Sequence, residues 1–299
     1  MSTSRWIATA LFATAATAAA AASAAPAAAA PLTTTVYTGS ADGFYVTSTL
    51  VAGEKDAILI DGQFDLADAH RLVATILESK KRLTTIYVTH FHPDHYFGLA
   101  VVMQAFPKAT LVALPAAVAE IKASYKAKLG YWGPIYGANL TTKPPIPTAL
   151  KGASLTLEGQ TLEIHAARGD AEHNSYVWIP STKTVIAGDI VYHGVHPWTA
   201  ESDAAARAGW RASLDELAKL GPTTVVPGHR EPRTKDDASG IAQTRAYLAA
   251  FDAAVAGTAS SAEAQKKVKA AFPDLQLDLI LQIGADAAFA PKPAAKPAK

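Results

Sequence analysis

A cluster of histidine and aspartate residues constrains the fold more than any other feature of this chain. Within six residues the sequence holds four side chains that can bind a metal ion: His90, His92, Asp94 and His95. They follow the apolar run 86–88, which has the pattern of a buried strand. The cluster should therefore lie at the carboxyl end of a sheet strand, where the sites of α/β proteins form. Because burying so many polar groups without partners is costly, we expect a metal site there.

The spacing within the cluster suits two metals rather than one. His90 and His92 alternate along an extended segment and so point to the same side, while Asp94 and His95 point elsewhere. One short segment can thus present one pair of ligands to each of two ions. An exposed polar loop that happens to hold three histidines is the alternative, and the buried strand before it argues against that interpretation.

Strands followed by strand–helix units occur twice, on either side of a Pro-rich segment at residues 141–152. Glycines separate the apolar, β-rich segments, and helical periodicity follows them in each half. Two sheets packed together with helices outside would account for this order. We expect a single domain over residues 32–289. Its helices should cover residues 66–80, 96–105, 115–129 and 203–220, with a further one beginning near residue 236.

The two ends of the chain differ in composition from this body. Arg5 is the only charged side chain among the first 41 residues, an Ala-rich apolar run follows it, and residues 22–24 have the small-x-small pattern of a cleavage site. We interpret residues 1–24 as a signal peptide and 25–31 as an Ala/Pro leader, which implies a periplasmic or secreted protein. A membrane anchor or a disordered arm is the alternative, but alanine is too weakly apolar for a strong anchor. The Pro/Ala/Lys segment 290–299 is expected to be a disordered tail.

Cysteine is absent from the sequence, and the formal net charge is +1. The missing cysteine excludes disulfides, a thiol nucleophile and thiolate-bound zinc or iron–sulfur centres. The near-neutral charge disfavours a nucleic-acid binder, which needs a basic patch to neutralise phosphates. The histidines and carboxylates therefore carry the functional interpretation.

The pattern His-x-His-x-Asp-His after a strand resembles the metal-binding motif of the metallo-β-lactamase superfamily. Asp61, Asp189 and His229 each end or follow an apolar strand in the order that this family has. The resemblance covers the whole folded body and implies an α/β fold, the four-layer αβ/βα sandwich. It also implies that Asp61 braces the metal loop, that Asp189 bridges two metals and that His229 is the last histidine ligand.

The remaining ligand departs from the family pattern. The superfamily usually has a histidine in a Gly-His-Thr segment ahead of the bridging position. When residues 169–189 are compared with the zinc β-lactamases without gaps, Asp170 occupies that place. His173 could take the role only if the loop were remodelled. We favour Asp170 and keep His173 as the alternative.

With Asp170, the implied ligands are four histidines and three aspartates: His90, His92, Asp94, His95, Asp170, Asp189 and His229. Their negative charges would leave a site with two divalent ions and a bridging hydroxide roughly neutral. We favour zinc, with iron or manganese as alternatives because oxygen-rich donor sets suit harder metals.

The resemblance implies hydrolysis of a lactone, ester or related carboxyl bond by a metal-bridging hydroxide. Asp94 and Asp189 would also accept or orient the proton of the attacking water. Tyr192 is similar to the tyrosine that helps hold the carbonyl oxygen in the superfamily's acyl-homoserine-lactone hydrolases, although it equally suits an aromatic that closes a strand end. The alternatives are a β-lactamase and a protein that binds metal or ligand without turnover.

Aromatic side chains in two segments are expected to wall a cleft. They are Tyr131, Trp132 and Tyr136, together with the loop 193–198. Such a cleft suits a small-molecule substrate with an apolar acyl part. Ordinary packing in the core or in a lid is the other interpretation of these aromatics.

Overall fold

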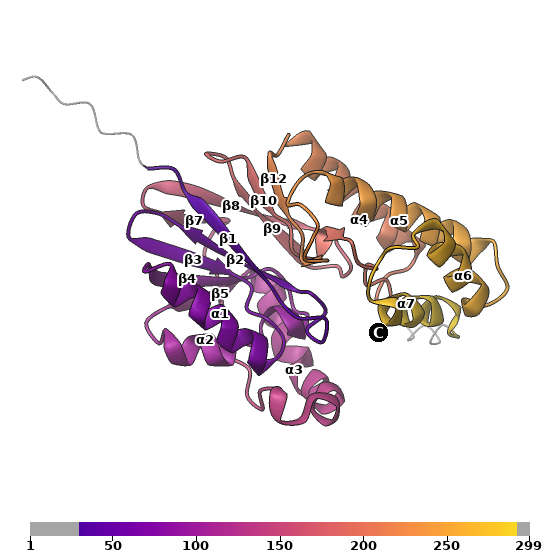
Figure 1. Cartoon of the computed structure of the whole chain (residues 1–299), viewed down its shortest axis with the longest axis horizontal. Helices are drawn as coiled ribbons and strands as arrows, with labels where there is room; N and C mark the ends of the chain where they lie inside the picture. Colours follow the sequence, from indigo (N-terminus) through magenta and orange to yellow (C-terminus); the bar gives the residue numbers. More distant parts are fainter. Residues whose placement is uncertain (1–29, 292–299) are drawn as a thin grey trace, which may run out of the picture.

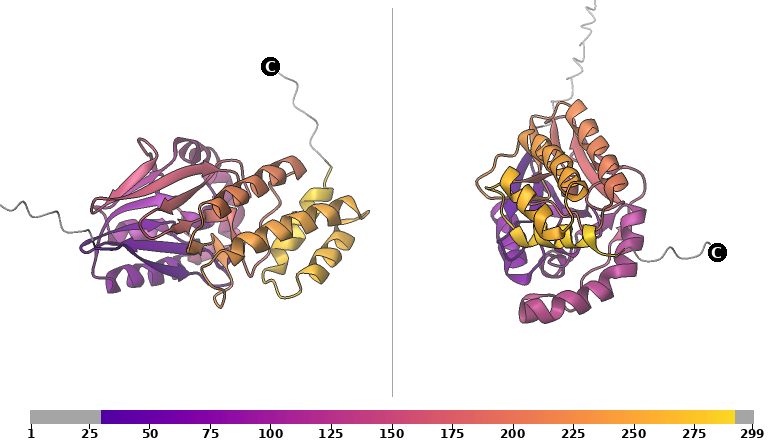
Figure 2. Two further views of the ribbon diagram at one scale, coloured as in Figure 1. Left: turned by 90° about the horizontal axis from the view of Figure 1, so that it is seen from above. Right: turned by 90° about the vertical axis from the view of Figure 1, so that its right-hand side faces the viewer.

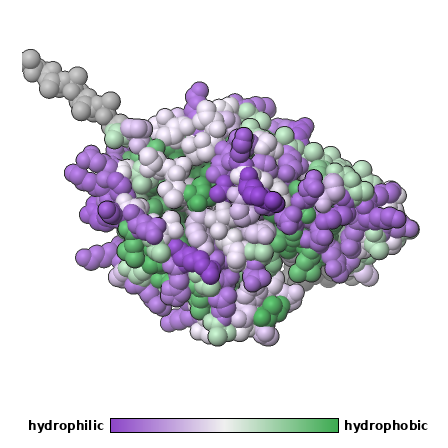
Figure 3. All heavy atoms as spheres, viewed as in Figure 1, coloured by the Kyte–Doolittle hydropathy of each residue, from purple (hydrophilic) through white to green (hydrophobic). Residues whose placement is uncertain are grey.

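The computed structural model describes residues 30–291 (Figure 1). The predicted signal peptide lies outside that range, as do all but two residues of the leader and of the tail. Among the described helices, none is long and apolar enough to cross a membrane. The face in Figure 3 is largely hydrophilic, with apolar side chains in separate patches.

The first of two central sheets has six strands. In spatial order they are β1 (Thr33–Thr38), β2 (Thr47–Ala52), β3 (Asp56–Ile60), β4 (Arg82–Val88), β5 (Thr110–Ala113) and β6 (Thr148–Ala149). The first three run antiparallel, and β3 to β6 run parallel. The carboxyl ends of β3 and β4 therefore lie at the same edge of the sheet.

The second sheet has five strands. In spatial order they are β12 (Thr224–Val226), β10 (Thr184–Ile186), β9 (Asn174–Ile179), β8 (Gln160–Ala167) and β7 (Ser154–Leu157). Only the β10–β12 pair is parallel. A short parallel pair, β11 (Tyr192–His193) with β13 (His229–Arg230), links the chain segments that follow β10 and β12.

Alternating side chains make the core between the two sheets. Ile58 and Ile60 of β3 pack in the same cluster as Val177 and Ile179 of β9. Leu59, which lies between the two isoleucines, packs instead in the cluster on the outer face of the first sheet. Strands buried on both faces need apolar residues at every position, which explains the continuous apolar runs in the sequence.

Helices cover both outer faces (Figures 1 and 2). The first sheet packs against α1 (Leu66–Glu78), α2 (Leu99–Ala105) and α3 (Pro115–Tyr136), and the second against α4 (Ala204–Lys219) and α5 (Ser239–Ala256). The predicted four-layer αβ/βα sandwich is therefore confirmed. Two further helices, α6 (Ser261–Ala271) and α7 (Asp278–Phe289), pack on α5 and were not predicted individually.

Helix α3 continues seven residues beyond its predicted end, although Pro134 lies inside it. A proline in a helix removes a hydrogen bond and crowds the preceding turn, so the sequence favours an earlier end. Aromatic packing stabilises the extra turns. The centroid of the Trp132 ring lies 5.4 Å from that of Phe64 and 5.6 Å from that of Phe44. The ring centroids of Tyr136 and Phe64 lie 4.7 Å apart.

The loop between β1 and β2 is held by a buried carboxylate on α1. Asp68 accepts hydrogen bonds from the Tyr37 hydroxyl at 2.8 Å and from the Ser40 amide and hydroxyl at 2.7 Å. Burial alone would raise the pKa of Asp68, but these donors and Arg71 outweigh it and lower that pKa. The same loop carries Phe44, whose carbonyl contacts the functional site described below.

We expect Asp68→Asn to lower the free energy of unfolding at pH 7 by about 1.5–3 kcal/mol, because the charged acceptor is lost. Since the folded-state pKa of Asp68 lies below the unfolded value, its contribution is full above about pH 5 and is lost as pH falls through the folded-state pKa. Urea unfolding of chelator-treated protein at pH 7 and at low pH measures both effects. Asp42→Asn, on the exposed part of the loop, is the control and should change little; equal losses in both variants would contradict the assignment.

Candidate metal centre

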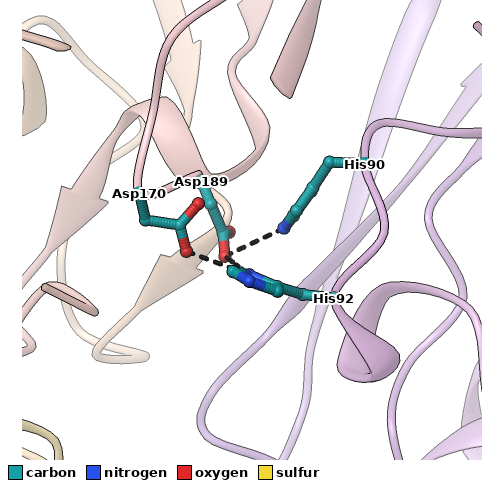
Figure 4. Close-up of side chains that lie close together, drawn as sticks. All are labelled: His90, His92, Asp170 and Asp189. Carbon is teal, nitrogen blue, oxygen red and sulfur yellow. Dashed lines mark ion pairs between the residues drawn. The ribbon is translucent and has the colours of Figure 1, made fainter. Parts of the chain in front are cut away.

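Polar side chains gather where strands of both sheets end. His90 follows β4, Asp170 follows β8, Asp189 follows β10 and His229 begins β13. Figure 4 shows two histidines on the ribbon of the first half pointing at two aspartates on the ribbon of the second half. The site is therefore built at the junction of the two halves, and neither half holds it alone.

One group contains His90, His92, Asp170 and Asp189, all buried. One potential ligand atom from each lies within 4.8 Å of the others. The His90 Nε2 atom is 3.3 Å from Asp189 Oδ2, and the His92 Nδ1 atom is 3.0 Å from Asp170 Oδ2. His90 and His92 point to the same side, as their alternation along the chain predicts.

A second group contains Asp94, His95 and His229, again within 4.8 Å of one another. Asp189 connects it to the first. The Asp189 Oδ1 atom lies 3.0 Å from His95 Nε2, and its Oδ2 atom lies 3.4 Å from His229 Nε2. The structure thus brings together all seven residues that the sequence analysis favours as ligands.

Several of these atoms lack hydrogen bonds. In the described part of the chain, His90 Nε2, His95 Nε2 and Asp189 Oδ1 are buried without a hydrogen-bond partner. Each orphaned buried polar atom costs about 1–3 kcal/mol, so native proteins have few of them. Imidazole nitrogens and carboxylate oxygens facing one another at such distances are donors for divalent metal ions. The residues present therefore fit a divalent metal site.

The charges agree with this assignment. Burial alone would raise the pKa of Asp189 and of Asp94, but the facing histidines outweigh it and hold both values below the ordinary range. Burial would lower the pKa of His229, but Asp189 and Asp94 outweigh it and raise that pKa to about 10. The carboxylates are therefore anionic at neutral pH, which suits them to face either protonated histidines or bound metal cations.

A buried aspartate orients the outer side of His95. The His95 Nδ1 atom lies 2.8 Å from Asp61 Oδ2, and Asp61 also accepts hydrogen bonds from the Thr89 amide and hydroxyl at 2.8 Å. Asp61 has a φ of +61°, an uncommon conformation for a residue with a Cβ. Such hydrogen bonds fix the ring and direct its other nitrogen inward. Asp61 thus lies where a brace for the metal loop is expected.

His229 is held in a similar way. Its Nδ1 atom lies 2.7 Å from the Phe44 carbonyl oxygen, on the loop secured by α1. The preceding Gly228 approaches the site so closely that a Cβ there would lie 2.1 Å from Asp189 Oδ1. A larger residue before His229 would displace the central carboxylate.

The comparison with known families agrees with this geometry. The family model described as Metallo-beta-lactamase superfamily matches residues 41–229. This chain belongs to that superfamily. The match ends at His229, so α5, α6 and α7 lie beyond it.

Named relatives show how far the likeness extends. Metallo-beta-lactamase type 2 of Bacillus cereus is 26% identical over 180 residues, which are 59% of this chain and 64% of the relative. The same enzyme of Bacillus sp. strain 170 is 26% identical over 178 residues, 58% and 63% of the two chains. The chain therefore spans less than two thirds of the length of these relatives.

Solved structures support the fold. A metallo-beta-lactamase family protein of Thermus thermophilus has a TM-score of 0.61 at 20% identity, covering 86% of this chain and 91% of its own. A metallo-beta-lactamase of Pontibacter korlensis has a TM-score of 0.54 at 19% identity, covering 73% and 95%. At such identities the likeness concerns the fold alone.

Tyr192 contacts both carboxylates of the first ligand group. Its hydroxyl is 2.9 Å from Asp170 Oδ2 and 3.0 Å from Asp189 Oδ2. Its ring stacks on that of His229, with centroids 5.2 Å apart. Burial, together with the two carboxylates, raises the pKa of Tyr192 well above its usual value, so its hydroxyl keeps its proton.

The two candidates for the remaining ligand separate clearly in space. Asp170 is fully buried and accepts a further hydrogen bond from Asn174 Nδ2 at 3.0 Å. His173 has a side chain 45% exposed, and its Nε2 lies 3.9 Å from Glu120 Oε1 outside both groups. The structure therefore places Asp170, and not His173, beside the other candidate ligands.

A cavity of about 470 Å³ opens onto the ligand groups. Of the aromatics expected to wall it, Tyr131, Trp132 and Trp198 do so. Tyr136 is absent from the lining and packs on Phe64 instead. The remaining apolar wall could not be predicted from the sequence; it comprises Phe44 and the residues Leu277, Ile280 and Ile283 at and within α7.

Two charged residues that line the cavity, Glu201 and Lys128, were not predicted from the sequence as site residues. Glu201 Oε2 lies 3.5 Å from His92 Nε2, the nitrogen that faces away from Asp170. Lys128 projects from α3. Glu201 closely follows the aromatic loop, which offered a weak signal, whereas Lys128 is one of several lysines on α3 and nothing in its spacing distinguishes it.

Asp170→Ala and His173→Ala form a matched pair for the disputed ligand. We expect the Asp170 variant to lose about one metal equivalent per chain, because an open position weakens the site, and the His173 variant to keep its metal. Elemental analysis after dialysis measures the content, and circular dichroism checks that both variants fold. Loss of metal from the His173 variant alone would reverse the assignment.

Proposed function

We propose that this protein is an exported metal-dependent hydrolase that opens a lactone, ester or related carboxyl bond. The observation that supports this is the pair of ligand groups joined by Asp189 at the end of a largely apolar cavity. The export depends on residues 1–24, which remain a prediction from the sequence.

Two divalent ions are part of the proposal. His90, His92 and Asp170 would hold one, Asp94, His95 and His229 the other, and Asp189 would lie between them. When bound, such ions lower the pKa of a shared water and polarise a substrate carbonyl. Zinc is the first choice, and the three carboxylates also suit iron or manganese.

Three side chains of this protein would take part directly. Asp94 and Asp189 are anionic acceptors that can orient the attacking water and receive its proton. The Tyr192 hydroxyl donates to the carboxylates of Asp170 and Asp189 in the structure. It keeps its proton and could turn to donate it to the carbonyl or leaving-group oxygen of a substrate. No serine or cysteine nucleophile is required.

The cavity favours a substrate with an apolar acyl part. Aromatic side chains from α3 and aliphatic ones from α7 face the space beside the ligand groups. Burial of an alkyl or aryl group there would contribute about 25 cal/mol per Å² of apolar surface.

A β-lactamase is the second candidate, because both curated relatives are named metallo-beta-lactamase type 2. Against it, this chain has Asp189 where zinc β-lactamases often have cysteine, and Tyr192 at the position three residues later where they often have lysine. We therefore place the lactone or ester first.

A three-substrate panel separates these candidates. We expect the purified protein to hydrolyse a 4-nitrophenyl ester and an acyl-homoserine lactone faster than a chromogenic cephalosporin, and a chelator to abolish all turnover. Added zinc should restore it. Turnover of the cephalosporin alone would favour the β-lactamase, and absence of chelator-sensitive turnover across the panel would contradict the proposal.

Tyr192→Phe should lower kcat by about 100-fold while metal content stays unchanged, because only a hydrogen-bond donor is removed. Tyr131→Phe removes a hydroxyl from the cavity rim and should leave kcat unchanged. If Tyr192→Phe instead loses metal in proportion to activity, the hydroxyl serves to hold Asp170 and Asp189, and its role in the reaction is refuted.

A further inference from the structure

Lys128 brings a positive charge next to the ligand groups. Its Nζ atom donates a hydrogen bond to the Phe91 carbonyl at 3.0 Å and lies 3.8 Å from the centroid of the Phe91 ring. Phe91 is the residue between His90 and His92. The ammonium is thus fixed at the wall of the cavity, beside the segment that carries the first ligands.

This ammonium lacks a counter-ion. Among the described residues, no carboxylate lies within ion-pair distance of Lys128, and the hydrogen bond to Phe91 uses one of its three N–H donors. Burial lowers the pKa of Lys128 to about 8, while the more distant carboxylates of Glu201 and Asp94 act in the opposite direction. Lys128 therefore remains mostly protonated at pH 7.

Glu201 does not fill this role. Its carboxylate lies 3.5 Å from His92 Nε2, where it can fix the ring of a ligand histidine, and its side chain is 43% exposed. The cavity lining also includes the aromatic rings of Tyr131 and Trp132. The carboxylates of Asp94 and Asp170 act on Lys128 from beyond ion-pair distance. A half-buried cation without a counter-ion is costly in such surroundings unless a ligand supplies the anion.

We propose that Lys128 binds a carboxylate of the substrate, so that the substrate is an ester or lactone carrying one free carboxylate near the bond that is cleaved. This rests on the proposed function and narrows its substrate class. A carboxylate is favoured over a phosphate because the described lining of the cavity contains no arginine, whose forked donors suit phosphate oxygens. The aromatic and α7 side chains would contact the apolar remainder.

Two esters that differ in one charge test this. They are the mono-4-nitrophenyl ester of glutaric acid and 4-nitrophenyl pentanoate. For Lys128→Met we expect kcat/KM to fall about 10- to 100-fold on the glutarate ester, mainly through KM, and to stay within about twofold on the pentanoate ester. Lys128→Arg should recover part of the loss. Lys126→Met, on the exposed side of the same helix, is the matched control.

An equal fall on both esters would show that Lys128 only shapes the site, and no fall on the glutarate ester would show that it does not contact the carboxylate. Either result overturns the proposal.

A binding measurement keeps this proposal separate from the proposed hydrolysis. Fluorescence of Trp132 and Trp198, both in the cavity lining, reports binding of hexanoate and of neutral hexanamide to chelator-treated protein. We expect Lys128→Met to weaken hexanoate binding about 10-fold and to leave hexanamide binding unchanged. Equal hexanoate binding by wild type and variant would overturn the role of Lys128. If Lys128→Met weakens hexanoate binding but the wild type hydrolyses no ester, the proposed hydrolase activity is refuted and the role of Lys128 stands.

Discussion

The carboxylate of Asp189 is the group on which the centre of this protein depends. It lies within 3.4 Å of histidine nitrogens from both ligand groups and is almost completely buried. An unpaired carboxylate in that position would be very costly, so positive partners must surround it. The two sheets provide them where their strands end: His90 and His95 come from the loop after β4, and His229 comes from the segment after β12.

Contacts on the outer side of three candidate ligand histidines orient their rings. Asp61 holds His95, the Phe44 carbonyl holds His229, and Glu201 lies against His92. Each contact uses the ring nitrogen that faces away from the centre, so the other nitrogen is directed inward. Phe44 belongs to the loop between β1 and β2, and Asp68 of α1 holds that loop by hydrogen bonds outside the site. The position of His229 therefore depends on this loop.

Sequence patterns and the family resemblance predicted the four layers, and the fold brings the seven candidate ligands together in two groups. Strand burial and the spacing of residues 90–95 could be predicted because they are local properties. Sequence patterns were less informative where distant segments meet. Helix α3 is longer than its local propensity predicts because Trp132 and Tyr136 pack on Phe64. Similarly, Lys128 resembles its neighbours on α3 in sequence, and only the folded chain places it in the cavity wall.

The metal-binding motif, the order of the strands and the absence of thiol chemistry follow from the amino-acid sequence without any knowledge of the fold. The choice between Asp170 and His173 required the folded chain, since it depends on which side chain the loop after β8 turns toward His92. The walls of the cavity required it too, because α7 comes from the far end of the chain. The burial of a side chain and its distance from residues far along the chain depend on the whole fold, so the periodicity of the sequence cannot predict them.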